Sequence, residues 1–525
     1  MQQVIARTAP KNKSNLIIRI SLVLAGLILA ATVVLVVRWP FRLAAVVKQL
    51  QEEGLGKVEV GEFHQTYFPR PGCVLQKVRF QHNPKPGAPP LITIETVRIE
   101  GSFSGLFAQH VKRIRAEGMH ILVPPKSAEE HFQTPQRSSI VIDELIADGA
   151  VLEVSSAAQN RSLKFSFHNF DLSDIGSNGP ATFHARFSNP EPPGEITASG
   201  KFGPWNADDF GKTPTSGDYQ FQQADLSVFH GIAGLLSSPG KFSGVLDHIE
   251  VQGETDVPDF TVTSSSHKVR LRSQFQAEVN GQNGDTLLHQ VLANFLKTTV
   301  SARGTVAGQG IQPGKTASFE LTTNEGRIQD ILLLFTQAER APMSGITSFH
   351  AKVSIPPGSR PFLQKVELQG DFGIDAGTFS NSNTQEGVNH MSEGALFGAE
   401  DRSKAEKKEK EEESETVLSD LKGRVLLKDG TARFTDLSFS VPGASARMQG
   451  TYNLINEKID LRGTLKTESE PSNTTTGVKS LMLKVLNPFF KKKRAGYVMP
   501  VKITGTYKHP LFGLDLVDSR KNTEK

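Results

Sequence analysis

The chain has 525 residues, 37% of them hydrophobic and 22% charged, which is apolar enough to fold but lean for a compact enzyme. Its 59 basic and 55 acidic residues leave a formal net charge of +4, too even for a protein held on nucleic acid by phosphate contacts. Cys73 is the only cysteine, which excludes intramolecular disulfides and cysteine-based zinc sites. The 32 phenylalanines, against 5 tyrosines and 2 tryptophans, favour a large dry surface over a sugar-binding one.

An apolar run near the N-terminus predicts a membrane-spanning helix. Residues 20–37 carry no charge, and residues 16–18 extend the run past Arg19, so it is long enough to cross a hydrocarbon core. A secretory signal peptide is the alternative. The apolar core of a signal peptide is shorter than this run, and a small-residue cleavage site follows such a core, whereas no convincing one follows here. Basic residues without acidic neighbours precede the run and favour a cytoplasmic N-terminus. We therefore expect a single-pass anchor with nearly all of the mass beyond it.

Strict alternation of apolar and polar residues predicts β-strands throughout the rest of the chain. The clearest example is 269–279, where Leu271, Phe275 and Ala277 alternate with charged or amide side chains. The same pattern covers 163–167, 183–187, 349–355, 459–465 and 501–503. A period of two gives each strand one apolar face and one wet face, which is typical of antiparallel sheets. The turn residues 428–430 and 441–443 separate some of these strands.

Seven glycines fall on the apolar phase of predicted strands: Gly200, Gly253, Gly304, Gly370, Gly450, Gly463 and Gly505. A glycine weakens a strand but permits a bulge or sharp coiling. Repeated on one face, such glycines would let a long sheet curl about its apolar side. The alternative is a series of ordinary sandwich strands with chance glycines. We expect a mainly β fold with a long, curled, groove-like antiparallel sheet.

A few short amphipathic helices are predicted between the strands. Asp285 is expected to cap a helix whose apolar side carries Leu287, Leu288, Val291, Leu292, Phe295 and Leu296. A second helix is expected at 328–335 and a third at 478–489. Basic residues 491–494 follow the third helix, which would either lie on an anionic membrane or plug the end of the sheet.

A charged stretch divides the part of the chain beyond the anchor. Residues 400–415 are almost wholly charged and lack apolar periodicity, so 382–416 is interpreted as a flexible linker or loop. The expected organisation is a tail and anchor at 1–42, a β region at 43–381, this linker, and a C-terminal domain at 417–525.

Motifs for catalysis are incomplete. Gly314-Lys315-Thr316 resembles the end of a phosphate loop, but Gln309 stands where the loop requires its first glycine. No His-Glu-x-x-His zinc sequence occurs, and Phe103 occupies the centre of the one segment that resembles a nucleophile elbow. We expect a protein that is not an enzyme, with no catalytic residue, no metal site and no small-molecule cofactor.

The order of these features resembles the AsmA-like family of Gram-negative envelope proteins. The similarity is carried by the segment after the anchor, by two strand-rich blocks and by the C-terminal patterns. These are residues 54–60, 91–99 with 119–124, 142–152, and the strand patterns between Leu421 and Tyr507. The motifs are loose β patterns that cover most of the chain after residue 20.

The resemblance implies a long antiparallel sheet with an apolar inner groove, distantly like bridge-like lipid-transfer proteins. It implies an inner-membrane location with the bulk of the chain in the periplasm. Family members are implicated in moving phospholipid toward the outer membrane and were earlier linked to the targeting and assembly of outer-membrane proteins. The expected partners are membrane lipids, with other envelope proteins as further candidates and no nucleic acid.

The apolar positions of the predicted strands are the candidates for lining such a groove. They are Phe165, Phe167, Phe183, Phe187, Leu271, Phe275, Val353, Ile355, Leu461 and Ile503. The sequence leaves open whether these side chains line an open groove or fill a core. Three alternatives therefore remain: an assembly factor that binds nascent outer-membrane β-proteins, a structural exported β-protein with a packed core, and a hydrolase on a β scaffold.

Overall fold

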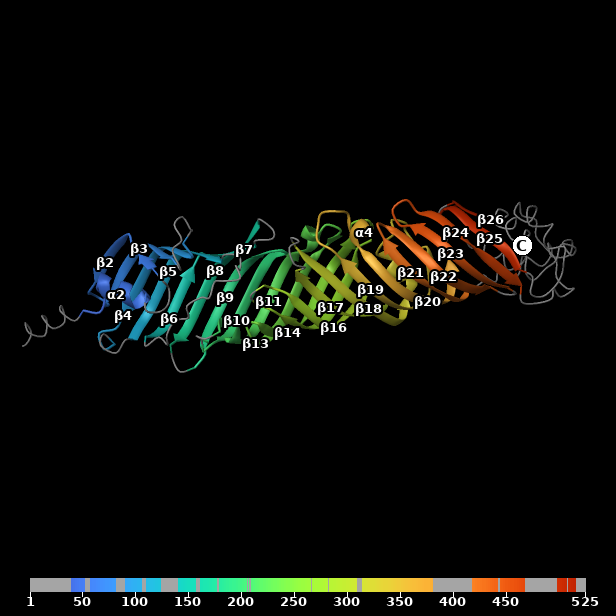
Figure 1. The fold of residues 1–525 in the computed structure, drawn as a ribbon. Coiled ribbons are helices and arrows are strands. Elements are labelled where there is room, and N and C mark those ends of the chain that lie inside the picture. The colour runs from blue at the N-terminus through green and yellow to red at the C-terminus, as the bar shows by residue number, and fades with distance from the viewer. Residues whose placement is uncertain are drawn as a thin grey trace, which may run out of the picture. The chain divides into compact units, whose positions relative to one another are not determined.

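The structure is a computed structural model that describes most of the chain. The described residues are 39–51, 57–81, 90–105, 110–123, 140–156, 161–176, 179–204, 206, 209–265, 267–281, 283–308, 314–380, 418–441, 444–467, 498–507 and 509–515. The fold is mainly β, with 26 strands in one mixed, largely antiparallel sheet and few short helices (Figure 1). The chain divides into two compact units. Unit 1 comprises residues 1–123, 128–151 and 169–181, and unit 2 comprises 124–127, 152–168 and 182–525.

Five predicted features fall wholly or partly outside the described residues: the anchor at 16–37, the linker at 382–416, the turn at 441–443, the helix at 478–489 and the basic residues 491–494. Within the described ranges, no helix is both long enough and apolar enough to cross a membrane. The strands on either side of the 382–416 segment, β20 and β21, pair directly with each other, so the sheet continues from Leu368 opposite Leu427 to Ile374 opposite Leu421.

Among its described residues, unit 1 contains helix α2 and the first strands of the chain. These are α2 (Leu43–Leu50), β1 (Lys57–Glu59), β2 (Glu62–Thr66), β3 (Gly72–Gln81), β4 (Ile92–Gly101), β5 (His110–Val123), β6 (Val141–Asp148), the start of β7 (Ala150–Ser156) and the end of β8 (Arg161–Ile175). β1 and β2 both pair with β3, and β3, β4 and β5 are successive antiparallel neighbours.

One strand pair in unit 1 departs from the predicted antiparallel sheet. β5 and β6 run parallel, with His110 opposite Val141 and Glu117 opposite Asp148. A parallel pair needs a connection of about a dozen residues or more, because the chain must return to the same end of the sheet. Residues 124–140 provide that length.

The largest share of the buried side chains of unit 1 comes from β3 and β4, and Trp39 and Phe41 before α2 are buried as well. Leu75 and Cys73 are fully buried, and Phe41 and Val46 pack at the edge of this core. Gly72 lies in the same strand, where a side chain would meet the carbonyl oxygen of Ile99 at 2.1 Å. The close approach of β3 and β4 therefore closes the core around the Cys73 thiol.

We expect Cys73 to be chemically inert in the folded protein. Burial raises the pKa of this thiol from 9.0 to about 12, so the reactive thiolate is depleted by a factor of about 1,000 at pH 8. The raised pKa also means that unit 1 loses stability as the pH rises above about 9, where only the unfolded thiol ionises. Iodoacetamide labelling followed by mass spectrometry should give modification in denaturant and almost none without it. Rapid labelling of the native chain would contradict the burial.

Unit 2 contains the end of β7, the start of β8, β9 from its second residue onward and every later element. Its next strands are β9 (Ala181–Pro190), β10 (Pro193–Phe202), β11 (Pro214–Asp225), β12 (Ile232–Ala233), β13 (Leu235–Val245), β14 (His248–Val262), β15 (Val269–Val279), β16 (Thr286–Phe295) and β17 (Thr298–Gly308). The later strands are β18 (Lys315–Arg327), β19 (Met343–Ile355), β20 (Glu367–Phe379), β21 (Ser419–Lys428), β22 (Thr431–Val441), β23 (Ala444–Asn453), β24 (Lys458–Thr467), β25 (Val498–Thr506) and β26 (His509–Leu514). The short helices are η2 (Phe210–Lys212), η3 (Leu226–Phe229), α3 (Ile328–Leu333) and α4 (Phe362–Lys365).

The strands of unit 2 form a simple antiparallel meander. β10 pairs with β11, β11 with β13, and from β13 to β26 every strand pairs antiparallel with the next along the chain. The predicted strands at 163–167, 183–187, 269–279, 349–355, 459–465 and 501–503 all lie in observed strands, and the prediction is confirmed there. Asp429 and Gly430 form the predicted turn between β21 and β22.

The two predicted helices inside the described part of unit 2 had different outcomes. The helix expected at 328–335 is confirmed as α3, which is two residues shorter. The prediction of a helix after Asp285 is wrong, because residues 286–295 form strand β16. A β-bulge shifts the register of β16, so that Leu288 lies opposite Ala277 while Gln290 lies opposite Gln276. The extra residue puts Leu288 and Val291 on the same face although they are three apart, which imitates the spacing of a helix.

One part of unit 2 has a packed hydrophobic core. It is built from β19 to β26, with Ile328 and Leu332 of α3 packed against it. Its fully or almost fully buried members are Met343, Ile374, Leu418, Leu421, Leu437, Phe439, Val441, Ala444, Ala446, Met448, Leu465, Met499, Val501 and Leu514. These strands are therefore stabilised by side-chain packing as well as by their backbone ladder.

Candidate functional site

A single cross-strand row of apolar residues runs through unit 2, and we call it the central row. Residues directly opposite each other in a sheet share a face, so the registers define one line of side chains over sixteen strands. The central row is Ala198, Tyr219, Gly240, Gly253, Phe275, Val291, Ala302, Leu321, Ala351, Gly370, Val425, Phe434, Gly450, Leu461, Ile503 and Phe512. It contains no charged residue, and the hydroxyl of Tyr219 is its one polar side-chain group.

All ten candidate lining residues lie on the face that carries the central row, called the apolar face. Phe275, Leu461 and Ile503 belong to the row itself, and Leu271, Val353 and Ile355 lie two or four positions along the same strands. The four phenylalanines of β8 and β9 join this face through ring contacts. Their ring centroids are 4.9 Å apart for Phe167–Phe187, 6.4 Å for Phe165–Phe187, and 6.4 Å for Phe183 and Phe242 of β13.

Most of the apolar face is only half-buried. Of the ten candidates, Val353 alone is buried, at 9% exposed, and the other nine have intermediate exposure. The opposite face of the same strands is exposed and carries cross-strand ion pairs such as Arg270–Asp256, at 2.6 Å, and Arg303–Glu320, at 2.6 Å. The sheet therefore has one polar face in water and one apolar face that lacks full cover over much of its described length.

Aromatic rings on the apolar face lie over glycines of neighbouring strands. Tyr219 is opposite Gly240, and Phe275 is opposite Gly253. A β-carbon at Gly240 would lie 2.6 Å from the ring of Tyr219, and one at Gly253 would lie 3.2 Å from that of Phe275. The same arrangement recurs in the pairs Gly217–Phe242, Gly304–Phe319 and Gly423–Phe372, and Phe434 also lies opposite a glycine, Gly450. The glycines thus leave space for rings that cover the backbone.

The seven glycines singled out in the sequence all lie inside strands, where a neighbouring backbone leaves no room for a side chain. At Gly463 the β-carbon would lie 1.9 Å from the carbonyl oxygen of Arg447, and at Gly200 it would lie 2.0 Å from that of Ser216. Gly253, Gly304, Gly370, Gly450 and Gly505 make comparable approaches of 2.0 to 2.8 Å. A larger residue at any of these positions on the apolar face would therefore collide with the neighbouring strand.

The pKa values of titratable groups differ between the two faces. Burial raises the pKa of Tyr452 on the apolar face to about 12, with Glu457 and Tyr507 adding to the shift. Burial also raises the pKa of Tyr219, although Ser238 partly offsets this through a hydrogen bond. On the polar face, a hydrogen bond from Arg270 is the main reason that the pKa of Asp256 is lowered. The apolar face is a poor environment for charge, and the polar face is a good one.

The packed core limits which candidates can serve as a binding surface. Leu461 and Ile503 are partly buried against that core, and Val353 lies between Phe319 and Leu368 in a buried position. By contrast, Phe275, Phe183 and Phe187 lie outside it. The half-exposed section around β8 to β16 is therefore the best candidate site.

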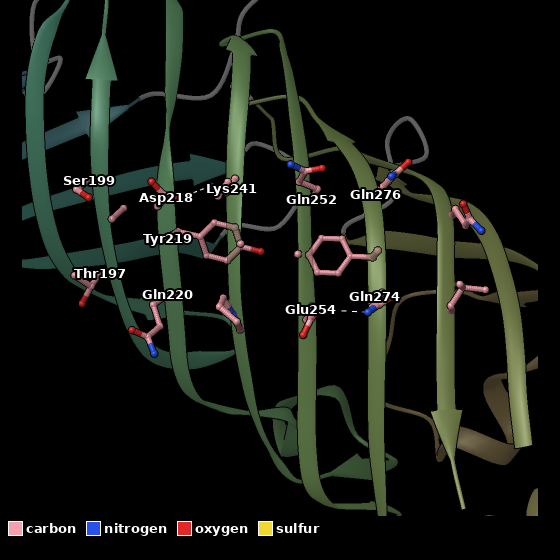
Figure 2. A pocket seen from close by; sticks show the side chains of 17 residues that line it. Thr197, Ser199, Asp218, Tyr219, Gln220, Lys241, Gln252, Glu254, Gln274 and Gln276 are labelled. Carbon is pink, nitrogen blue, oxygen red and sulfur yellow. Dashed lines mark hydrogen bonds and ion pairs between the residues drawn. The ribbon is translucent and has the colours of Figure 1, made fainter. Parts of the chain in front are cut away.

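A hollow of about 840 Å³ in this section is lined by five residues of the central row, Ala198, Tyr219, Gly240, Gly253 and Phe275, and by the mostly polar residues that flank them on the same strands. Figure 2 shows its labelled side chains in rows: one contains Ser199, Asp218, Lys241, Gln252 and Gln276, and another contains Thr197, Gln220, Glu254 and Gln274. Side chains of these rows alternate with the central row and so point away from the face of Tyr219 and Phe275. The hollow therefore lies at the central row and is bordered by the side chains of both polar rows.

Sequence reasoning missed several members of the apolar face, among them Tyr219, Phe242, Phe319 and Phe434. The signal that could have identified them is an aromatic residue opposite a glycine, but only the strand register shows that pairing. Among the described residues, no group of three or more His, Cys, Asp or Glu side chains is placed to hold a metal ion. Comparison of the chain with known protein families, with curated proteins and with solved structures finds no match.

Proposed function

We propose that the protein carries phospholipid by holding acyl chains against the apolar face of unit 2. The observation that carries the proposal is the central row, which continues over sixteen strands without a charged residue and is only partly buried for much of its length. Burial of acyl chains against such a surface contributes about 0.8 kcal/mol for each methylene removed from water. Many weak contacts of this kind hold a lipid and still let it exchange between neighbouring positions.

The close strand approaches at the seven glycines support a sheet that curls about its apolar side into a groove. At each of these glycines, an added β-carbon would overlap the next strand, and such positions permit the sharp coiling that a curled sheet needs. Rings that lean over those glycines would form the floor of the groove. In this proposal the chain is of the AsmA-like type, anchored in the inner membrane by residues 16–37, with its bulk in the periplasm and a role in outer-membrane lipid homeostasis. It needs no catalytic residue and no cofactor.

Photocrosslinking in cells tests the proposed cargo with the full chain. A photoreactive amino acid replaces Phe275 on the apolar face, and the matched control replaces the adjacent Gln276, which is exposed on the polar face. We expect ultraviolet light to attach phospholipid at position 275 and not at 276, as measured by mass spectrometry of the purified protein. The two positions differ only in the face of β15 to which they point, so the comparison isolates that face.

The same experiment separates the rival functions. Attachment of other polypeptides at position 275, without lipid, would favour a factor that assembles outer-membrane β-proteins. Attachment only to residues of the same chain would favour a structural protein with a packed core.

A further inference from the structure

Exposed aromatic side chains gather at one end of unit 1. Phe68 is 83% exposed, Tyr67 is 53% exposed, and Phe103 is 54% exposed. Tyr67 and Phe68 lie in the connection between β2 and β3, and Phe103 lies in the turn after β4. Large apolar side chains with this exposure, grouped on one surface, mark a site of interaction with a protein or a membrane.

The two connections are neighbours because of the pairing of β3 with β4. Gly72 at the start of β3 lies opposite Glu100 near the end of β4. The N–H of Gly101 donates to the carbonyl oxygen of Pro71 at 2.7 Å, and Arg70 forms an ion pair with Glu100 at 2.8 Å. The three exposed rings are therefore held at one end by backbone pairing.

Trp39 links this surface to the N-terminal segment. It is 4% exposed, and its ring centroid lies 4.9 Å from that of Tyr67 and 6.0 Å from that of Phe41. Its indole N–H is buried and has no hydrogen-bond partner among the described residues. A buried donor without a partner is costly, so the contacts of the Trp39 ring with Tyr67 and Phe41 must hold it in place.

The sequence before Trp39 indicates which partner covers the surface. The uncharged run of residues 20–37 ends two residues before Trp39, so a bilayer that holds this run begins beside the aromatic surface. Tryptophan and tyrosine are enriched where a bilayer meets water, because their rings are apolar and their N–H or O–H groups are polar. Arg42, exposed at the start of α2, adds positive charge that suits anionic headgroups.

We propose that Tyr67, Phe68 and Phe103 enter the headgroup region of the bilayer and seat unit 1 directly on the membrane. Trp39, which is buried and packed against Tyr67, links this surface to the segment that follows the anchor. The inference rests on the proposed anchor and is independent of the proposed acyl-chain cargo of unit 2.

The test is fluorescence quenching on the full chain in vesicles of phosphatidylethanolamine and phosphatidylglycerol. Single cysteines replace Phe68 and Phe103 and carry an environment-sensitive fluorophore, while the buried native Cys73 stays unlabelled. The control is Lys57→Cys, which lies opposite Gln81 at the other end of β3, about 30 Å from Gly72 at ~3.3 Å per residue. Contact with the bilayer should blue-shift the emission of the probes at 68 and 103, because their surroundings become less polar. Lipids with a nitroxide on the headgroup should quench these two probes. The probe at 57 should show neither effect.

Flotation of the same samples gives the second readout. Protein that floats with the vesicles but shows equal quenching at positions 57 and 68 would overturn the membrane contact while the anchor stands. Protein that does not float would overturn both the anchor and the contact. Neither outcome alters the photocrosslinking result at position 275, so failure of this inference and failure of the proposed cargo are distinguishable.

Discussion

Replacement of Gly463 by alanine should destabilise the C-terminal strands by about 3 kcal/mol, although it adds only one methyl group. Gly463 lies in β24 opposite Met448 of β23 and Val501 of β25. The new β-carbon would lie 1.9 Å from the carbonyl oxygen of Arg447 and 2.7 Å from the Cα of Met448. Both are backbone atoms, so no side-chain rotation relieves the overlap and the two strands must separate.

The effect should remain local, which hydrogen–deuterium exchange measured by mass spectrometry would show. Each strand in a meander contacts mainly its neighbours, so a lesion at one pair propagates only a short way. We expect faster exchange in β23, β24 and β25 and unchanged exchange in β14 to β16. The control is Gly308→Ala, where a β-carbon meets nothing within 4 Å. Equal exchange for the two variants would show that the close approach at Gly463 is not needed.

The strands were predictable because their signal is local. In 269–279 the apolar side chains recur at every second residue, and the structure has β15 over the same residues. β16 was misread because the bulge near His289 adds one residue to the strand, so the apolar residues on either side no longer have a period of two. A single sequence cannot distinguish that spacing from a helical turn, since the bulge is visible only against the neighbouring strand.

The apolar face was only partly predictable because its composition depends on register. Phe275 could be assigned to an apolar face from its own strand, but its position over Gly253 depends on the pairing of β14 with β15. Tyr219 was missed although it and Phe221 alternate with Asp218 and Gln220, because only the pairing with Gly240 shows that its ring lies over a glycine. Parallel pairing of β5 and β6 was missed for the same reason, because strand direction depends on how residues 124–140 return the chain.

Replacement of Phe275 by aspartate should abolish lipid binding at the centre of the apolar face and leave the fold largely intact. Phe275 is half-buried, so a carboxylate at this position keeps part of its hydration and costs the fold little. An acyl chain that covers the carboxylate would remove that hydration at a cost of about 2 kcal/mol, which corresponds to a roughly 30-fold loss of occupancy. The readout is lipid attached to a photoreactive residue at Val291, the next position of the central row.

The matched control is Gln276→Asp, which places the same charge on the polar face one residue away. It should leave both lipid attachment at position 291 and the melting temperature unchanged, because Gln276 is exposed between Gln252 and Gln290. If Phe275→Asp unfolds unit 2, the apolar face is a filled core and the structural reading of this protein is correct. If the variant folds and still acquires lipid at position 291, the acyl chains do not lie along the central row. Only a folded variant that loses lipid agrees with a surface that is apolar, open and continuous from strand to strand.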